Sequence, residues 1–258
     1  MTDERFVRIE RLVGAERFAR LQRSFVVVAG LGAVGSYAVE ALARAGVGRL
    51  RLVDFDILRP SNVNRQLLAL EPNLGRLKVE VAGERVRQIN PRCEVEALAL
   101  FVHRETLDRV LEGAPDAVVD AIDAVTPKTE LLAAARTRNL RIVSSMGAAL
   151  RQDASALRVG TLGESTHCPL ARQIRKRLRA RRVPCDFPCV FSVEPVQAIP
   201  REAVDRAGAE RDDALQRGRP RRVLGSLPTI TGLFGLTAAH EVLRGLMETD
   251  GSKPVSQA

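Results

Sequence analysis

The sequence predicts a doubly wound α/β fold with a mostly parallel sheet, and two observations carry this prediction. The first is a continuous apolar run at residues 25–29, which is typical of a strand buried on both faces. A glycine-rich turn, GLGAVG, follows at residues 30–35 and opens a helix rich in small residues. The second is the alternation of apolar and helical segments up to residue 147, which favours a parallel sheet wound on both sides.

The individual elements follow from hydrophobic periodicity and from turn residues. An amphipathic helical lead is expected over residues 4–22. Strands are expected at residues 24–29, 49–54, 93–100, 116–122 and 141–146, with helices between them at about 35–45, 75–90, 104–112 and 127–138. Further along we expect a strand at 154–163, a very basic helix at 168–182, a strand at 189–199, an exposed mobile loop at 200–222 and an apolar helix at 225–247.

Composition and charge narrow the class of protein. Hydrophobic residues make up 45% of the 258 residues, which is enough for a sizeable core. The four cysteines form no paired CxxC sets, so neither a structural zinc site nor a disulfide framework is expected. The N-terminus lacks a signal peptide and the apolar run at 223–239 is short for a membrane span, so we expect a cytoplasmic protein without an integral membrane segment. The net charge of +9 favours a polyanionic partner.

The glycine turn predicts a nucleotide-binding site. Gly30, Gly32 and Gly35 allow the backbone to approach a phosphate closely, and the amino end of the following helix attracts the anion. Asp54 ends the next apolar strand about 20 residues later, where nucleotide-binding units place the carboxylate that binds ribose hydroxyls. A purely structural tight turn is the alternative, and the acid in this position favours a bound nucleotide.

Four further polar side chains have no evident use in a hydride-transfer enzyme and suit attack on the α-phosphate of ATP. Arg65 and Lys78 carry the charges needed to clamp phosphate oxygens and the leaving pyrophosphate. Asp123 follows the fourth strand and is predicted to hold Mg²⁺, while Asn62 orients the phosphates or the ribose. The structural alternatives are loop contacts for Asn62 and Arg65, a solvated charge for the lysine and a helix cap for the aspartate.

Five segments together resemble the adenylating core of ubiquitin-activating-type (ThiF/MoeB-like) enzymes, which include the activators of sulfur-carrier proteins. They are LVDFD (52–56), SNVNRQ (61–66), GRLKVE (75–80), INP (89–91) and DAID (120–123). This part of the resemblance covers roughly residues 5–147. Three other features are most similar to the tRNA threonylcarbamoyladenosine dehydratase branch of that superfamily: RLVG (11–14), CVFSVE (189–194) and GSLPTITGLFG (225–235).

The resemblance implies a Rossmann-like ATP-binding adenylation core at residues 23–148, after the helical lead at 1–22 and before a substrate-facing extension at 149–258. It implies an ATP-dependent enzyme that cyclises threonylcarbamoyladenosine in tRNA by adenylating its carboxylate, and that acts as a homodimer. Arg11, or alternatively Arg8, is the arginine expected to reach the partner subunit's site. Catalytic roles are also implied for Arg65, Lys78 and Asp123, Mg²⁺ binding for Asp123, and ATP contacts for Gly30, Gly32, Gly35, Asp54, Asn62, Arg65 and Lys78.

Two departures from the family pattern favour the tRNA branch over carrier-protein activation. The zinc cysteines of the sulfur-carrier activators are missing, and Ala124 stands where those activators often have asparagine. Two alternatives stay open. One is C-terminal adenylation of a ubiquitin-like sulfur carrier, with a sulfur-transfer partner protein. The other is a nucleotide-gated RNA-binding scaffold without turnover, against which Arg65, Lys78 and Asp123 argue.

The segment 172–182 carries seven basic residues and no acidic one. Such a density suits the phosphates of a nucleic acid, and a solvated basic face is the alternative. Cys189 is interpreted as a buried small hydrophobe rather than a nucleophile. Glu194 is open to positioning the substrate, to acting as a base, or to a structural pairing. The predicted RNA contacts are Arg175, Lys176, Arg179 and Arg182.

Overall fold

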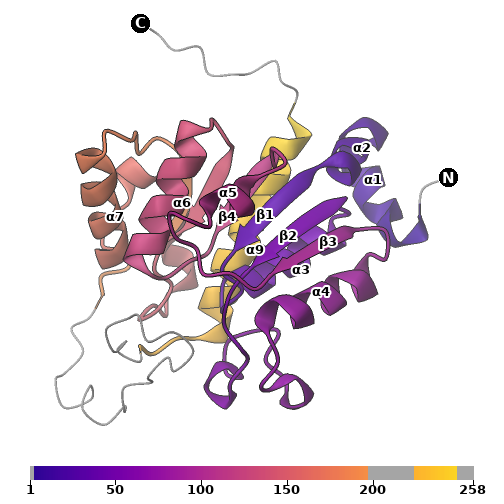
Figure 1. Ribbon diagram of the computed structural model, residues 1–258, viewed down its shortest axis with the longest axis horizontal. Coiled ribbons are helices and arrows are strands. Elements are labelled where there is room, and N and C mark those ends of the chain that lie inside the picture. The colour runs from indigo at the N-terminus through magenta and orange to yellow at the C-terminus, as the bar shows by residue number, and fades with distance from the viewer. Residues whose placement is uncertain (1–2, 197–223, 249–258) are drawn as a thin grey trace, which may run out of the picture.

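The apolar run at Phe25–Ala29 forms β1, an inner strand of a seven-stranded sheet, in the computed structural model, which describes residues 3–196 and 224–248 (Figure 1). Val26 and Val28 pack into the core on one face of the sheet, and Val27 and Ala29 into the core on the other. Burial on both faces is the reason that this segment is continuously apolar. The predicted fold class is therefore confirmed.

The sheet has the strand order β3-β2-β1-β4-β5-β7-β6. All neighbouring strands are parallel except β6, which runs antiparallel to β7. The chain crosses from the β3 side of β1 to β4 on its other side, so a topological switch point lies between β1 and β4. The remaining strands are β2 (Arg49–Val53), β3 (Glu94–Leu98), β4 (Ala117–Asp120), β5 (Ile142–Ser145), β6 (Leu157–Thr161) and β7 (Pro188–Ser192).

Helices cover the sheet on both faces (Figure 1). One core contains the apolar sides of α3 (Gly35–Arg44), α4 (Lys78–Ile89) and α9 (Pro228–Met247). The other contains those of α5 (Leu107–Leu111), α6 (Val125–Thr137) and α7 (Pro169–Ala180). The N-terminal helices α1 (Val7–Val13) and α2 (Ala15–Arg23) are joined to the sheet through Phe6 and Phe18, which pack at Gly46 just before β2.

The extension after residue 148 completes the same sheet. It supplies β6 and β7, and β7 pairs with β5 through Ser144 and Cys189. Its long apolar helix α9 packs closely on α3, because Gly235 has no side chain that would collide with the carbonyl oxygen of Val34. The extension therefore shares one sheet with the predicted core and contributes residues to the hydrophobic cores on both of its faces.

Several element boundaries differ from the predicted ones for local reasons. The lead is two helices, because Gly14 adopts a φ of 86° between α1 and α2. The strand expected at 154–163 is shortened by 3₁₀ turns on both sides of β6. The expected strand at 189–199 ends at Ser192 among the described residues, and the loop expected at 200–222 lies outside them. Along the described parts of the chain, no helix is long and apolar enough to span a bilayer.

Candidate active site

The predicted ATP-site residues are gathered at the carboxyl edge of the sheet. Gly30 follows β1, Asp54 follows β2, and Asp123 lies three residues beyond the end of β4. Because these strands are parallel neighbours, their carboxyl ends share one edge, beside the switch point. The structure therefore places these three residues where a doubly wound fold binds its ligands.

The three motif glycines meet different steric demands. Gly30 has a φ of 88°, and a Cβ there would lie 2.8 Å from the carbonyl oxygen of Ala121. A Cβ on Gly35 would overlap the carbonyl oxygen of Gly30 itself. Gly32 is different, because the nearest atom to a Cβ would be the amide nitrogen of Gln66 at 3.8 Å. The fold therefore requires the first and last glycines and leaves open space at the middle one.

Asp54 ties the glycine turn to the end of β2. Its carboxylate accepts hydrogen bonds from the amide of Leu31 at 2.7 Å and from the amide of Asp56 at 2.9 Å. Burial raises the pKa of Asp54, and the nearby charge of Lys78 opposes that shift. The carboxylate predicted to bind ribose thus also holds the backbone that would cradle the phosphates.

Lys78 begins α4 and is buried rather than solvated. Its ammonium group lies 2.6 Å from a carboxylate oxygen of Asp56, and its own amide donates to the Asp56 carbonyl. This arrangement contradicts the solvated-charge alternative and leaves the phosphate contact as a proposal. The sequence analysis did not identify Asp56 as the partner, although it stands two residues after Asp54 in the LVDFD segment.

The loop between β2 and α4 carries Asn62 and Arg65, which make local contacts. Asn62 is buried and its side-chain oxygen accepts from the amide of Arg59 at 3.0 Å. The Arg65 guanidinium donates to the Ser61 carbonyl at 2.8 Å and to the side-chain oxygen of Asn64 at 2.9 Å. Both residues therefore fix the loop, as the structural alternative predicts, and their ATP contacts remain predictions.

Gln66 lies beside the glycine turn, and the sequence analysis did not single it out. It is buried, and its side-chain oxygen has no hydrogen-bond partner among the protein atoms. Its amide nitrogen faces the space beside Gly32. Its side-chain oxygen is therefore a buried acceptor that no protein group uses. In the sequence, Gln66 could have been identified only from its place at the end of the SNVNRQ segment.

Asp123 is exposed on the turn between β4 and α6. Mg²⁺ is commonly held by one or two carboxylates together with substrate phosphates and waters, so a single aspartate at this edge fits the donor set. Within residues 3–196 and 224–248, no three His, Cys, Asp or Glu side chains form a cluster that could hold a metal. Binding of a nucleotide-bound Mg²⁺ by Asp123 therefore stays a prediction.

Arg11 and Arg8 are both exposed on α1 and lie away from this edge. The helices α1 and α2 pack against the turn that precedes β2, at the amino ends of the strands. Figure 1 shows them at the opposite end of the sheet from the loop between β2 and α4. Neither arginine reaches the site of its own chain, which leaves the predicted contribution to a partner subunit as a proposal.

The four predicted RNA contacts on the basic helix separate into two kinds. Arg175 is half-buried, and its guanidinium donates to the Ser165 carbonyl and to the Ser165 hydroxyl. Lys176 and Arg179 are exposed on α7, and Arg182 is exposed just beyond its end. The structure thus gives Arg175 a local bracing role and leaves the other three on the surface.

Glu194 and Cys189 both have structural surroundings. The Glu194 carboxylate accepts from the amides of Gln152 and Asp153, each at 3.0 Å, and so ties the chain after β7 to the chain before β6. Cys189 is buried on β7, and burial raises the pKa of its thiol to about 12. These contacts match the structural pairing and the buried-hydrophobe interpretation.

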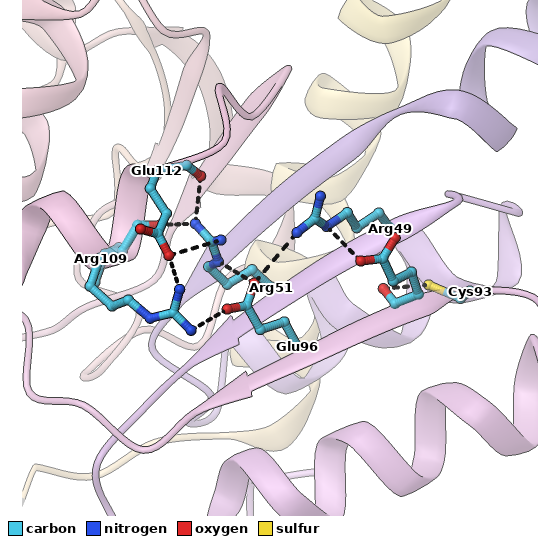
Figure 2. A network of polar contacts seen from close by, with 8 residues as sticks. Arg49, Arg51, Cys93, Glu96, Arg109 and Glu112 are labelled. Atoms are coloured by element: carbon cyan, nitrogen blue, oxygen red, sulfur yellow. Dashed lines mark hydrogen bonds and ion pairs between the residues drawn. The ribbon is translucent and has the colours of Figure 1, made fainter.

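A separate charged cluster covers β2 and β3 from their amino ends to their middle residues (Figure 2). Arg51 is buried and lies 2.8 Å from Glu96, and its guanidinium also donates to the carbonyls of Val110 and Glu112. Arg109 bridges Glu96 and Glu112 on the outer side. The hollow that these residues line has a volume of about 550 Å³. Its charges are paired within the chain and lie on the amino-terminal half of these strands, away from the glycine turn, so we interpret the cluster as structural.

Comparisons with known proteins agree with this geometry. The profile of the ThiF family matches residues 5–257. The tRNA threonylcarbamoyladenosine dehydratase of Bacillus subtilis is 35% identical, over 89% of this chain and 90% of its own length. The chain spans only 58% of a yeast relative, tRNA threonylcarbamoyladenosine dehydratase 2, which is 34% identical over 95% of this chain.

Solved structures show the same fold with nucleotides bound. Crystal structures of the Escherichia coli tRNA N6-threonylcarbamoyladenosine dehydratase, one with AMP and one with ATP, match with a TM-score of 0.82 at 32% identity. In each, the match covers 95% of this chain and 94% of the other. The glycine turn, Asp54 and Lys78 lie together at one edge of the sheet, in agreement with these matches. The family profile and the matched relatives show that the chain belongs to the ThiF family.

Proposed function

We propose that this chain is an ATP-dependent enzyme that cyclises threonylcarbamoyladenosine in tRNA. The observation that carries the proposal is the meeting of the glycine turn, Asp54, Lys78 and the Asp123 turn at one edge of the sheet. Relatives of the same fold and length bear the name of this activity, and their structures hold ATP or AMP. The site therefore suits adenylation of a substrate carboxylate.

In this reaction the threonyl carboxylate attacks the α-phosphate of ATP, and pyrophosphate leaves. The resulting mixed anhydride with AMP is attacked by a nitrogen or oxygen of the substrate's own carbamoyl group, which closes the ring and releases AMP. Water is lost overall, because the carboxylate oxygen departs on AMP. Bound Mg²⁺ supplies charge neutralisation to the phosphates.

The side chains around the site contribute binding and charge. The glycine turn and the amino end of α3 offer backbone N–H groups to the phosphates. Asp56 holds the Lys78 ammonium at this edge of the sheet. When ATP binds, the ammonium group would move from the Asp56 carboxylate to the phosphate oxygens. Cations aimed at charge that develops on the leaving pyrophosphate lower the barrier without any covalent step to the protein.

The test is AMP formation from ATP and Mg²⁺ in the presence of total tRNA that carries threonylcarbamoyladenosine. Lys78→Met keeps the length of the buried side chain and removes its charge. We expect AMP formation to fall by about a hundredfold, the size typical of removing a transition-state charge contact. Arg87→Met is the control, because Arg87 is an exposed cation on the same helix. Near-normal turnover by a folded Lys78→Met protein would refute the site.

The same assay separates the remaining substrate classes. A relative named adenylyltransferase and sulfurtransferase MOCS3 is 30% identical, and this chain spans 47% of it. If pyrophosphate is released only with a ubiquitin-like carrier protein, the carrier-activation alternative is correct, because AMP stays on the carrier's carboxylate until a sulfur nucleophile displaces it. If the protein binds ATP and RNA and releases pyrophosphate with neither substrate, the scaffold alternative is correct.

Contact between tRNA phosphates and α7 forms the second part of the proposal. Changing the exposed Arg172, Lys176, Arg179 and Arg182 to glutamine, with Arg175 retained, is expected to weaken binding of all tRNAs about equally. The slope of log affinity against log salt should flatten by about 0.7–0.9 for each phosphate that these side chains no longer neutralise. ATP affinity, measured alongside, should stay unchanged. Equal tRNA affinities and slopes for parent and variant would return these charges to a solvated face.

A homodimer in which Arg11 serves the partner's site is the third part. The exposed leucines Leu233 and Leu236 on α9 offer apolar surface for a second copy. Mixing Arg11→Ala protein with Lys78→Met protein should restore part of the activity, because a mixed dimer holds one site with both residues intact. Absence of rescue, with subunit exchange demonstrated independently, would assign Arg11 to its own chain or to structure. Repeating the mixture with Arg8→Ala distinguishes the two arginines.

A further inference from the structure

An ion pair with no solvent exposure lies directly under the Asp123 turn. The Lys128 ammonium on α6 is 2.8 Å from a carboxylate oxygen of Asp120, the last residue of β4, and both side chains are fully buried. The same Asp120 oxygen accepts from the Ser144 hydroxyl on β5 at 2.6 Å. The pair therefore links a strand end, the next strand and the first turns of a helix.

The pair holds the Ile122 peptide groups from both sides. The Lys128 ammonium donates to the Ile122 carbonyl at 2.9 Å, and the Ile122 amide donates to the second Asp120 oxygen at 3.2 Å. The Ile122 carbonyl belongs to the peptide bond that leads into Asp123. Its orientation is thus set by a lysine whose side chain has no solvent exposure.

The held turn also lies against the glycine turn. A Cβ on Gly30 would be 2.8 Å from the Ala121 carbonyl oxygen and 3.1 Å from the Ile122 nitrogen. The Ala121 amide in turn donates to the Ala29 carbonyl at 2.8 Å. A shift of the 121–123 backbone would therefore move both the phosphate-binding turn and the Asp123 carboxylate.

Stability gives little reason to place an ion pair here. Removing two charges from water costs about as much as their attraction returns, and apolar residues of similar volume often stabilise such a position as well or better. A buried pair that fixes a backbone turn next to reacting groups instead provides preorganisation.

We propose that Lys128, together with Asp120, is a positioning residue that holds the 121–123 turn in register with the glycine turn for Mg²⁺–ATP. The inference rests on the proposed adenylation reaction only for the identity of the nucleotide. It concerns a residue that makes its contribution through the Ile122 backbone and not by touching ATP.

The experiment compares Lys128→Met, Lys128→Arg and the double variant Asp120→Leu with Lys128→Met. The double variant leaves no unpaired buried charge, so it is expected to fold with a urea midpoint near that of the parent. Its affinity for ATP in the presence of Mg²⁺, measured by calorimetry, should fall by about 10–100-fold, the usual effect of removing support behind a metal-site ligand. The Mg²⁺ concentration needed for half-maximal ATP binding should rise, and Lys128→Arg should recover part of both losses.

Thr129→Val is the matched control. Thr129 is buried on the same helix, and its hydroxyl donates to the Val125 carbonyl rather than to the 121–123 turn. It should leave ATP affinity and its Mg²⁺ dependence unchanged. A folded double variant that binds Mg²⁺–ATP as the parent does would overturn the inference. The readout is ATP binding, so this result can be told apart from failure of the tRNA reaction. If only the tRNA reaction failed, the parent and the double variant would still differ in ATP affinity.

Discussion

The motif glycines allow the structural and the ligand-binding demands on one turn to be separated experimentally. Gly32→Ala places a methyl group in a space where the nearest atom lies 3.8 Å away, and its φ is outside the left-handed region. Replacing glycine by alanine at such a position stabilises a protein by about 0.4–1 kcal/mol, chiefly by restricting the unfolded chain. We therefore expect Gly32→Ala to unfold at the same or a slightly higher urea midpoint.

Gly35→Ala should behave in the opposite way. Its methyl group would overlap the Gly30 carbonyl oxygen and would also come within 2.8 Å of the Gly30 carbonyl carbon. Those are backbone atoms at the end of a buried strand, so relief requires a movement of α3 away from β1. Overpacking of this kind costs about 1–3 kcal/mol, and sometimes more. The urea midpoint of this variant should fall clearly below that of the parent.

The nucleotide gives the second readout. Glycine at the middle position of this motif permits the backbone to approach the phosphates, so the Gly32→Ala methyl group should collide with bound ATP. We expect at least about a tenfold loss of ATP affinity in a variant whose stability is unchanged, and calorimetric titration with Mg²⁺–ATP measures it. Parent-like ATP affinity in Gly32→Ala would show that the phosphates do not lie over this turn. Parent-like stability of Gly35→Ala would refute the steric reasoning.

Three other outcomes follow from burial and charge. Arg51→Met should lower the free energy of unfolding by about 3 kcal/mol in urea titrations, because it leaves Glu96 and two carbonyls without their buried donor. Arg49 is partly exposed, so Arg49→Met should cost about 1 kcal/mol or less. Cys189→Ala should retain AMP formation, and Cys189 should resist alkylation at pH 8 in the folded protein, because a thiol whose pKa is about 12 is almost entirely protonated there. Burial raises the pKa of Asp54 in the folded protein. Its contribution to stability is therefore present below the pKa of the unfolded chain and is lost as pH rises through the pKa of the folded protein. In urea titrations at a series of pH values, the stability of the parent relative to Asp54→Asn should fall as the pH rises above about 4.

The sequence was sufficient to predict the glycine turn and Asp54 because both depend on local order along the chain. A buried strand, a glycine turn and a second strand that ends in an acid determine which residues meet at the carboxyl edge, whatever the rest of the chain does. The same reasoning placed Asp123 at that edge. Residues 25–29 were predictable as a strand because burial on both faces leaves a continuous apolar run.

Contacts between separate elements were not predictable in this way. Lys128 stands in the sequence as an ordinary helical lysine, and only the packing of α6 over the sheet shows that its ammonium group meets Asp120. The inward turn of Arg175 onto Ser165 depends on the loop before α7, so a charge count along the helix overestimates its exposed basic face by one residue. The antiparallel β6 is a similar case, because its pairing with β7 joins segments separated by the whole of α7.

The charge balance at the carboxyl edge connects these contacts to the need for cations. Asp54, Asp56 and Asp123 lie on the turns where a polyanionic triphosphate is proposed to bind, and repulsion between like charges opposes that binding. The hydrogen bonds from Leu31 and Asp56 to the Asp54 carboxylate offset part of its charge, and Lys78 lies against Asp56. These contacts engage two of the carboxylates before the phosphates arrive. A divalent ion between Asp123 and the phosphates would offset further repulsion between the carboxylates and the triphosphate, which is the physical reason to expect ATP affinity to depend on Mg²⁺.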